Sequence, residues 1–212
     1  MQWSKLLSRY SLALLLQLML PSPAVQARDI TSPWLDRAQA LEKQGNWPAL
    51  LQLGRQWSET DSGNPLAWFV LGRAYGELKR YPEAIDAYRQ NLRVDPSDSY
   101  AYNNLGNSYH ALKRHREAMA AYHDAVRAEP GYLLAWRNLG QTYYDLKGPA
   151  GVARALQRLQ ATDPALAEAW RRLASTYAVT RGARVEEEAI QILRGLSPAQ
   201  RDRMFAILLE DV

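Results

Sequence analysis

A short residue pattern recurs in this chain at a constant spacing of 34 positions. The motif Leu-Gly-x-x-Tyr begins at Leu71, Leu105 and Leu139, and a related Leu-Ala-x-x-Tyr begins at Leu173. An aromatic residue lies three positions before each motif, at Trp68, Tyr102, Trp136 and Trp170. A proline closes each unit, at Pro96, Pro130, Pro164 and Pro198. A constant period of this length indicates a stacked array, in which one unit buries its apolar face only against its neighbours.

Within one unit, the apolar residues follow the period of two helices. In the unit 99–132, one stripe favours a helix over about residues 100–112, and a second favours a helix over about residues 116–128. Gly106 lies in the first helix, where glycine costs about 1 kcal/mol relative to alanine. We therefore expect the second helix to pack closely at Gly106, through small residues such as Ala118 and Ala125. The pair Glu129-Pro130 ends the second helix, because the residue before a proline is pushed out of the helical region.

These features resemble the tetratricopeptide repeat (TPR) family over most of the chain. The resemblance implies an all-α fold, an α-solenoid of about five helix-turn-helix units in a right-handed superhelix. The units are expected at about 31–64, 65–98, 99–132, 133–166 and 167–200, and the two outer ones match less well. After them, Ser197-Pro198-Ala199-Gln200 has the form of a helix start. The apolar stripe Met204, Ile207 and Leu208 follows it and predicts a C-terminal capping helix over about residues 198–211.

The first 27 residues have the composition of a secretory signal peptide. Lys5 and Arg9 precede a short apolar run at residues 11–20, and small residues end the segment at Ala27. The run is about half as long as a helix that spans a membrane, which favours a cleaved signal peptide. A retained membrane anchor is the alternative. Cleavage after about Ala27 would leave the TPR domain 28–212, exported to the periplasm and without a stable membrane anchor.

Composition excludes several classes of function. There is no cysteine, which removes disulfides, thiolate metal sites and cysteine nucleophiles. The leader carries two basic residues and no acidic one, so its removal lowers the net charge from +4 to +2 and weakens any case for nucleic-acid binding. No phosphate-binding loop or hydrolase motif is present. The three histidines His110, His115 and His123 lack metal-ligand spacing and are expected on the solvated surface. We predict no catalytic residues, no metal and no cofactor.

The TPR resemblance places a partner-binding site on the first helix of each unit, facing a concave groove. The expected contact residues are Phe69, Arg73, Tyr100, Asn103, Asn104, Asn107, His110, Leu134, Arg137, Asn138, Gln141, Tyr144, Arg171 and Arg172. Asn104 and Asn138 lie one period apart and resemble the asparagine ladder by which some family members hold an extended peptide. A carboxamide suits this role because it both donates and accepts hydrogen bonds. The alternative is that asparagine only tolerates a solvated helix face.

The arginines of this set suggest an acidic partner segment, since a guanidinium can hold a carboxylate with two parallel hydrogen bonds. The leading hypothesis is a non-catalytic scaffold of the bacterial cell envelope that binds an extended peptide or a partner subunit in its groove. The alternative is a homo-oligomeric structural or assembly factor of an envelope complex, without a peptide-binding groove.

Overall fold

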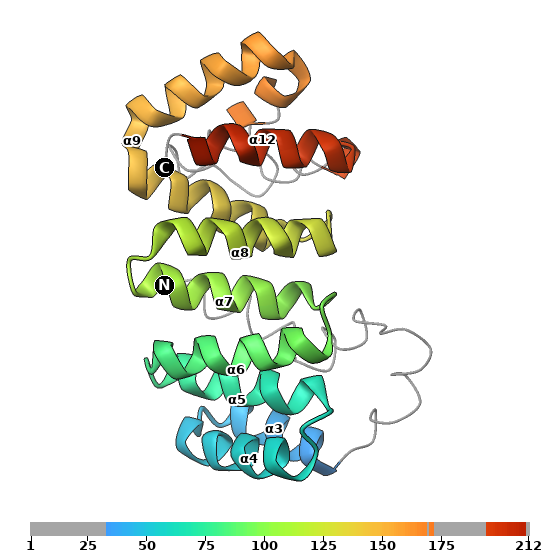
Figure 1. Cartoon of the computed structure of the whole chain (residues 1–212). Coiled ribbons are helices and arrows are strands. Elements are labelled where there is room, and N and C mark those ends of the chain that lie inside the picture. Colours follow the sequence, from blue (N-terminus) through green and yellow to red (C-terminus); the bar gives the residue numbers. More distant parts are fainter. Residues whose placement is uncertain (1–32, 169, 172–193, 211–212) are drawn as a thin grey trace. The chain divides into compact units, whose positions relative to one another are not determined.

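A computed structural model describes residues 33–168, 170, 171 and 194–210, and every regular element in them is an α-helix (Figure 1). The predicted all-α solenoid is confirmed. The leader, Arg172 and most of the predicted unit 167–200 lie outside the described residues. The chain forms two compact units, residues 1–80 and residues 81–212.

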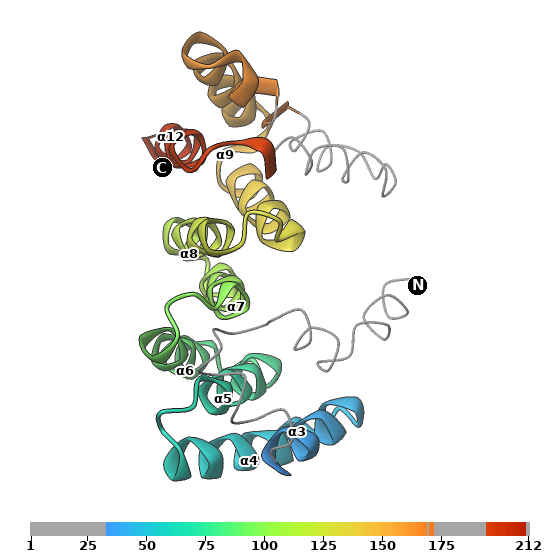
Figure 2. The same ribbon diagram turned by 90° about the vertical axis from the view of Figure 1, so that its right-hand side faces the viewer.

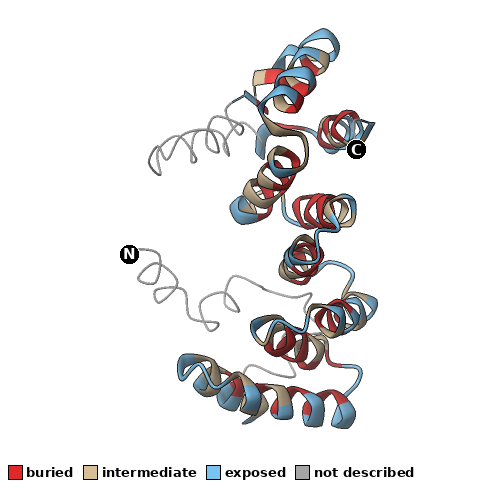
Figure 3. Ribbon diagram, turned by 90° about the vertical axis from the view of Figure 1, so that its left-hand side faces the viewer, coloured by how far each residue is buried: buried red, intermediate tan, exposed pale blue. Residues whose placement is uncertain are grey.

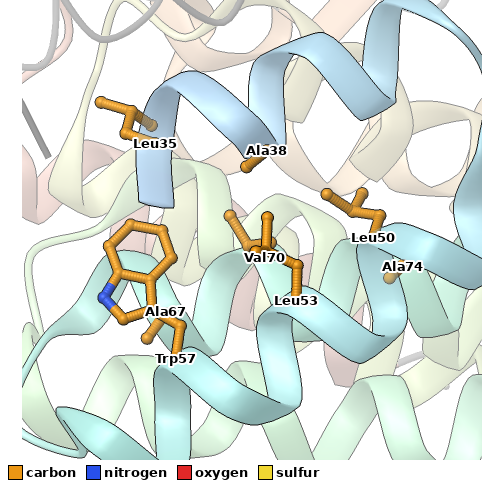
Figure 4. Close-up of a cluster of buried hydrophobic side chains, with 8 residues drawn as sticks. All are labelled: Leu35, Ala38, Leu50, Leu53, Trp57, Ala67, Val70 and Ala74. Atoms are coloured by element: carbon orange, nitrogen blue, oxygen red, sulfur yellow. The ribbon is translucent and has the colours of Figure 1, made fainter. Parts of the chain in front are cut away.

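The first unit contains three described helices, α3 (Pro33–Lys43), α4 (Trp47–Thr60) and α5 (Pro65–Glu77). Asparagine side chains cap α4 and α5: Asn46 accepts from the backbone N–H of Ala49, and Asn64 from that of Leu66. Figure 4 shows the apolar cluster between the three helices, formed by Leu35, Ala38, Leu50, Leu53, Trp57, Ala67, Val70 and Ala74. This cluster is the core that the helical periodicity of each segment produces.

Gly54 allows α4 and α5 to approach with their backbones in contact. A Cβ atom at this position would lie 2.9 Å from the Cα of Leu71. Real Cβ atoms essentially never come so near to backbone. Glycine at residue 54 therefore sets the separation of the two helices.

The second unit contains α6 (Tyr81–Val94), α7 (Ser99–Ala111), α8 (His115–Ala128), α9 (Leu133–Thr162) and α12 (Pro198–Glu210). Successive helices pack on one another from α6 to α9, and α7 also contacts α9 (Figures 1 and 2). Each helix has a buried and an exposed side (Figure 3), as expected for amphipathic helices in a stack.

The turns inside the helix pairs occur at a repeated position with a positive φ. Gly45, Lys79 and Lys113 follow one another at the 34-residue period, with φ of 64°, 60° and 60°. In α9 the break falls one position later, at Gly148, with φ 63° and ψ −173°. Pro149 follows directly and starts the second part of α9. The two helices of the unit 133–166 are therefore joined at Gly148-Pro149.

The close contact predicted at Gly106 exists, but an aromatic ring makes it. A Cβ at residue 106 would lie 2.5 Å from Cε1 of Tyr122, which belongs to α8. The Tyr122 hydroxyl then donates to Oδ1 of Asn107 at 2.8 Å. Ala118 and Ala125 of α8 are fully buried, and the ring of Tyr122 from the same helix occupies the space beside Gly106.

Two tyrosines of the repeated motif are each held by two arginines. Arg55 donates to the hydroxyl of Tyr75 at 3.0 Å, and the guanidinium of Arg80 lies 4.8 Å from the ring centre. One period later, Arg89 donates to the hydroxyl of Tyr109 at 2.8 Å, and Arg114 lies 4.7 Å from that ring. Hydrogen bonding and cation–π attraction thus fix the ring from both sides. One period after Arg89 and Arg114, the corresponding positions hold His123 and Gly148.

The capping helix α12 packs on α8 and α9. It buries the predicted stripe Met204, Ile207 and Leu208. Phe205 stacks on the ring of His123 with the centroids 3.8 Å apart. His123 is only 7% exposed, so the prediction that all three histidines lie on the solvated surface was wrong. The histidine at this repeat position forms part of the docking surface of α12.

The environment of His123 makes the docking of α12 sensitive to acid. Burial lowers the pKa of His123 to about 4, although the carboxylate of Asp202, with Oδ1 3.2 Å from Nε2, opposes the change. The charged neighbours are Arg127 and Asp124 on α8 and Arg201 and Asp202 on α12. Because the pKa in the folded state lies below the ordinary value of 6.5, the stabilisation is complete above about pH 6.5 and is lost toward pH 4.

We therefore expect the free energy of unfolding to fall by about 2 kcal/mol more in the native chain than in a His123→Phe variant between pH 7 and pH 4.5. Phenylalanine keeps an aromatic ring against Phe205 and removes the titrating group. Urea unfolding followed by circular dichroism at both pH values measures the difference. Equal losses in the two proteins would contradict this assignment to His123.

None of the described helices has the combination of length and apolar character that a membrane-spanning helix requires.

Candidate functional site

The predicted contact residues fall into three groups. Phe69 and Arg73 lie on α5 in the first unit. The largest group lies on α7 and α9 in the second unit: Tyr100, Asn103, Asn104, Asn107, His110, Leu134, Arg137, Asn138, Gln141 and Tyr144. Arg171 follows α9, and Arg172 is outside the described residues. Since α7 contacts α9, the structure brings members of the second group together.

Four asparagines of α7 and α9 form a connected carboxamide cluster. Nδ2 of Asn138 donates to Oδ1 of Asn103 at 2.9 Å and to Oδ1 of Asn107 at 3.2 Å. Nδ2 of Asn107 donates to Oδ1 of Asn104 at 3.4 Å. Asn104 and Asn138 therefore belong to one bonded network. In an asparagine ladder, each of the two side chains would bind the peptide independently.

Two predicted contact residues are buried. Asn103 is 1% exposed and accepts the bond from Asn138 inside the cluster, so its role is to position Asn138. Phe69 is 6% exposed. Neither side chain presents surface to a partner in this structure, which corrects the expectation from the sequence. A helical pattern identifies the residues beside the core stripe, but it does not tell which of them the next helix covers.

A second polar group lies where α7 ends and the first part of α9 approaches its break. Asp145 accepts from Nε2 of Gln141 at 2.7 Å through Oδ1, and its Oδ2 lies 3.1 Å from Nε2 of His110. The side chain of Asp145 is 36% exposed and that of His110 is 31% exposed. Sequence reasoning missed Asp145. Asp145 lies four residues after Gln141 and therefore on the same face of the helix. This spacing could have identified it as a member of the surface.

We call the six side chains Asn104, Asn107, His110, Asn138, Gln141 and Asp145 the α7–α9 polar surface. All six are at least partly exposed. They offer hydrogen-bond donors, acceptors and one carboxylate, and they contain no nucleophile paired with a base. Within the described part of the chain, no group of three or more histidine or carboxylate residues could hold a metal ion. The chemistry of this surface suits recognition.

The arginines do not gather on this surface. Arg73 pairs with Glu42, with Nε 3.0 Å from Oε1, and burial raises the pKa of Glu42 while Arg73 opposes the change. Arg171 pairs with Glu168 and lines a shallow depression of about 460 Å³ on the second part of α9, beside Leu156 and Gln160. These two arginines are thus engaged with acidic residues of the chain itself.

Aromatic and aliphatic side chains lie at the start of α7 and α9. The rings of Tyr100 and Tyr132 contact each other, with the centroids 4.7 Å apart. Beside them, Leu133 and Leu134 are 41% and 43% exposed. Tyr132 was not among the predicted contact residues, because it precedes α9 and lies outside the helix pattern.

Two sequence-family models match the centre of the chain. A model described as TPR repeat matches residues 72–113, and one described as tetratricopeptide repeat matches residues 99–132. Together the two models match residues 72–132. A search of curated proteins finds no significant match.

Solved structures of similar fold match about four fifths of the chain at low sequence identity. A crystal structure of MamA is 16% identical with a TM-score of 0.51, and the match covers 79% of this chain and 93% of that one. A second MamA structure is 17% identical with a TM-score of 0.52, covering 81% and 89%. YrrB, described as a TPR protein with an unusual peptide-binding site, is 21% identical with a TM-score of 0.50, covering 85% and 91%. At these identities the likeness establishes a TPR-type solenoid.

Proposed function

We propose that the protein is a non-catalytic interaction scaffold that holds an extended peptide or a segment of a partner subunit on the α7–α9 polar surface. The observation that carries the proposal is the set of six amide, imidazole and carboxylate side chains that two consecutive repeats present on adjacent helices. YrrB, a TPR protein of similar fold, has a peptide-binding site, which supports the same use of this fold here.

The hydrogen bonds inside the surface leave defined groups for a ligand. Asn138 uses Nδ2 in both of its side-chain bonds, and no bond within the described residues uses its Oδ1. Asn104 uses Oδ1 as an acceptor, and in the same residues its Nδ2 has no bond. One acceptor and one donor on neighbouring helices match the N–H and C=O of a peptide unit, irrespective of its side chain.

The proposed location is the cell envelope, in the periplasm. The support is the sequence of residues 1–27, with its basic start, short apolar run and small residues before about Ala27. A partner in this compartment would be a subunit or an exposed segment of an envelope assembly. An acidic segment remains a prediction from the sequence, although Arg73 and Arg171 already have partners in the chain.

An Asn104→Ala/Asn138→Ala variant is expected to lose at least tenfold of its affinity for the native partner, because several hydrogen bonds to the ligand disappear. Affinity capture from an envelope extract, followed by a binding titration of the captured protein, measures the loss. Gln157→Ala, an exposed amide on the second part of α9, is the matched control and is expected to bind as the native chain does. Equal binding by the double variant, with its helix content retained, would exclude this surface.

A homo-oligomeric assembly factor is the second candidate. The exposed Leu133 and Leu134 beside the pair Tyr100 and Tyr132 favour it, since adjacent exposed apolar side chains often mark an interface. Sedimentation at increasing protein concentration distinguishes the two functions. A mass that remains that of one chain excludes self-assembly.

A further inference from the structure

We infer that the α7–α9 polar surface selects a peptide with a basic side chain, lysine or arginine, which pairs with the carboxylate of Asp145. This inference rests on the proposed function and adds the charge of the ligand to it. It reverses the charge that the arginine pattern of the sequence suggests.

Two polar neighbours, Gln141 and His110, hold the carboxylate of Asp145 in place. Gln141 donates to one carboxylate oxygen at 2.7 Å, and His110 lies 3.1 Å from the other. Among the described residues, no lysine or arginine forms an ion pair with Asp145. Each oxygen keeps a second lone pair, and the side chain is 36% exposed, so a ligand cation can reach it.

The helix itself adds negative potential at this point. Asp145 lies in the last turn before the break at Gly148, where the carbonyl groups of the first part of α9 end. A carboxylate in the last turn is unfavourable for the helix, because the helix dipole is negative there. A basic ligand group would be attracted by the carboxylate and by the helix end together.

The arginine of the same helix lies at a distance from this end. Arg137 is eight residues before Asp145, which corresponds to about 12 Å along the helix. Arg73 pairs with Glu42, and Arg171 pairs with Glu168. Asp145 is thus the carboxylate of the surface, and the neutral amides of Asn104, Asn107 and Asn138 lie on the same two helices. This arrangement favours an extended peptide whose backbone contacts the amides and whose basic residue contacts Asp145.

The test uses the full chain as bait for a display library of randomised 12-residue peptides. Native protein is expected to enrich peptides with lysine or arginine at one fixed position. The Asp145→Asn variant is expected to enrich without that preference, and the control Asp86→Asn, an exposed carboxylate on α6, is expected to keep it. Because Asp145→Asn removes an unfavourable charge from the helix end, it should leave the fold intact.

A binding titration with one enriched peptide then quantifies the contact. Replacing its basic residue with norleucine is expected to weaken binding to the native chain about fivefold and to leave binding to Asp145→Asn unchanged. The fivefold difference should shrink as salt is raised from 50 to 500 mM, since charges at the surface are screened.

Three outcomes would overturn the inference and leave the proposed function standing. The native chain could enrich peptides without a basic residue, it could enrich acidic residues, or the basic preference could persist in Asp145→Asn. If no peptide is enriched above a bait-free control, the proposed function fails and the inference fails with it.

Discussion

Replacement of Trp136 with alanine is expected to lower the free energy of unfolding by about 4 kcal/mol. The indole is fully buried, and its Nε1 donates to the carbonyl of Pro130 at 3.1 Å. Alanine would leave a large cavity in the second unit and would remove the hydrogen bond to the Pro130 carbonyl. Urea unfolding of the full chain, followed by far-UV circular dichroism, measures the change.

Trp68 provides the matched control, because it occupies the same position two repeats earlier. Its Nε1 donates to the carbonyl of Ser62 at 2.8 Å, again six residues before the indole. The side chain of Trp68 is only partly buried. We expect Trp68→Ala to cost about half as much as Trp136→Ala, since less apolar surface leaves water at residue 68. Equal costs at the two positions would show that burial is not the cause.

Replacement of Gly106 with alanine is expected to destabilise the chain by about 2 kcal/mol, although alanine is the better helix former. The added Cβ would lie 2.5 Å from Cε1 of Tyr122, so the ring must move. Its movement would also weaken the bond from the Tyr122 hydroxyl to Asn107. The same unfolding measurement reports the cost, and the intrinsic fluorescence of the tyrosines reports the displaced ring.

Gly76→Ala is the control for helix propensity. A Cβ at residue 76 meets nothing within 4 Å, and the residue lies within α5. We expect this substitution to stabilise the chain by about 0.5–1 kcal/mol. The two glycine substitutions should therefore have opposite signs. A loss of stability at residue 76, or a gain at residue 106, would contradict the packing described for α7 and α8.

The helices could be predicted from the sequence because their signals are local and repeated. In the unit 99–132, the expected helices over about residues 100–112 and 116–128 correspond to α7 at Ser99–Ala111 and α8 at His115–Ala128. The pairs Glu129-Pro130 and Asp163-Pro164 end α8 and α9 as expected, with Glu129 and Asp163 as the C-caps. Each of these signals depends on residues at most a few positions apart.

The side-chain contacts between helices could not be predicted in the same way. His123 has the spacing of a surface residue, and only the docking of α12 some 80 residues later places Phe205 on its ring. Gly106 indicated a close contact, but not that a tyrosine makes it. Long-range contacts of this kind have no local signature.

The sequence predicted which repeats carry the candidate residues, but not the contacts that these residues make. The repeat pattern placed Asn104, Asn138 and Gln141 on consecutive repeats, and Asn138 of α9 donates to Asn107 of α7. The charge of the surface could not be predicted, because the sequence pattern does not show that Arg73 pairs with Glu42 and that Arg171 pairs with Glu168. Asp145 was overlooked because it carries no repeat signature.

The tyrosines held between two arginines bear on how an array of this kind changes its length during evolution. Each holding arginine, Arg55 or Arg89, comes from the helix before the tyrosine, and the second arginine comes from the turn after it. Duplication of a 34-residue block would copy both arginines together with the tyrosine that they hold. At residue 123 the histidine stacks on Phe205 of the capping helix, and the next tyrosine, Tyr143, donates to the carbonyl of Gly151 and contacts the ring of Trp170 edge-on. The same repeated position thus serves packing between successive helices at residues 55 and 89, and the docking of the capping helix at residue 123.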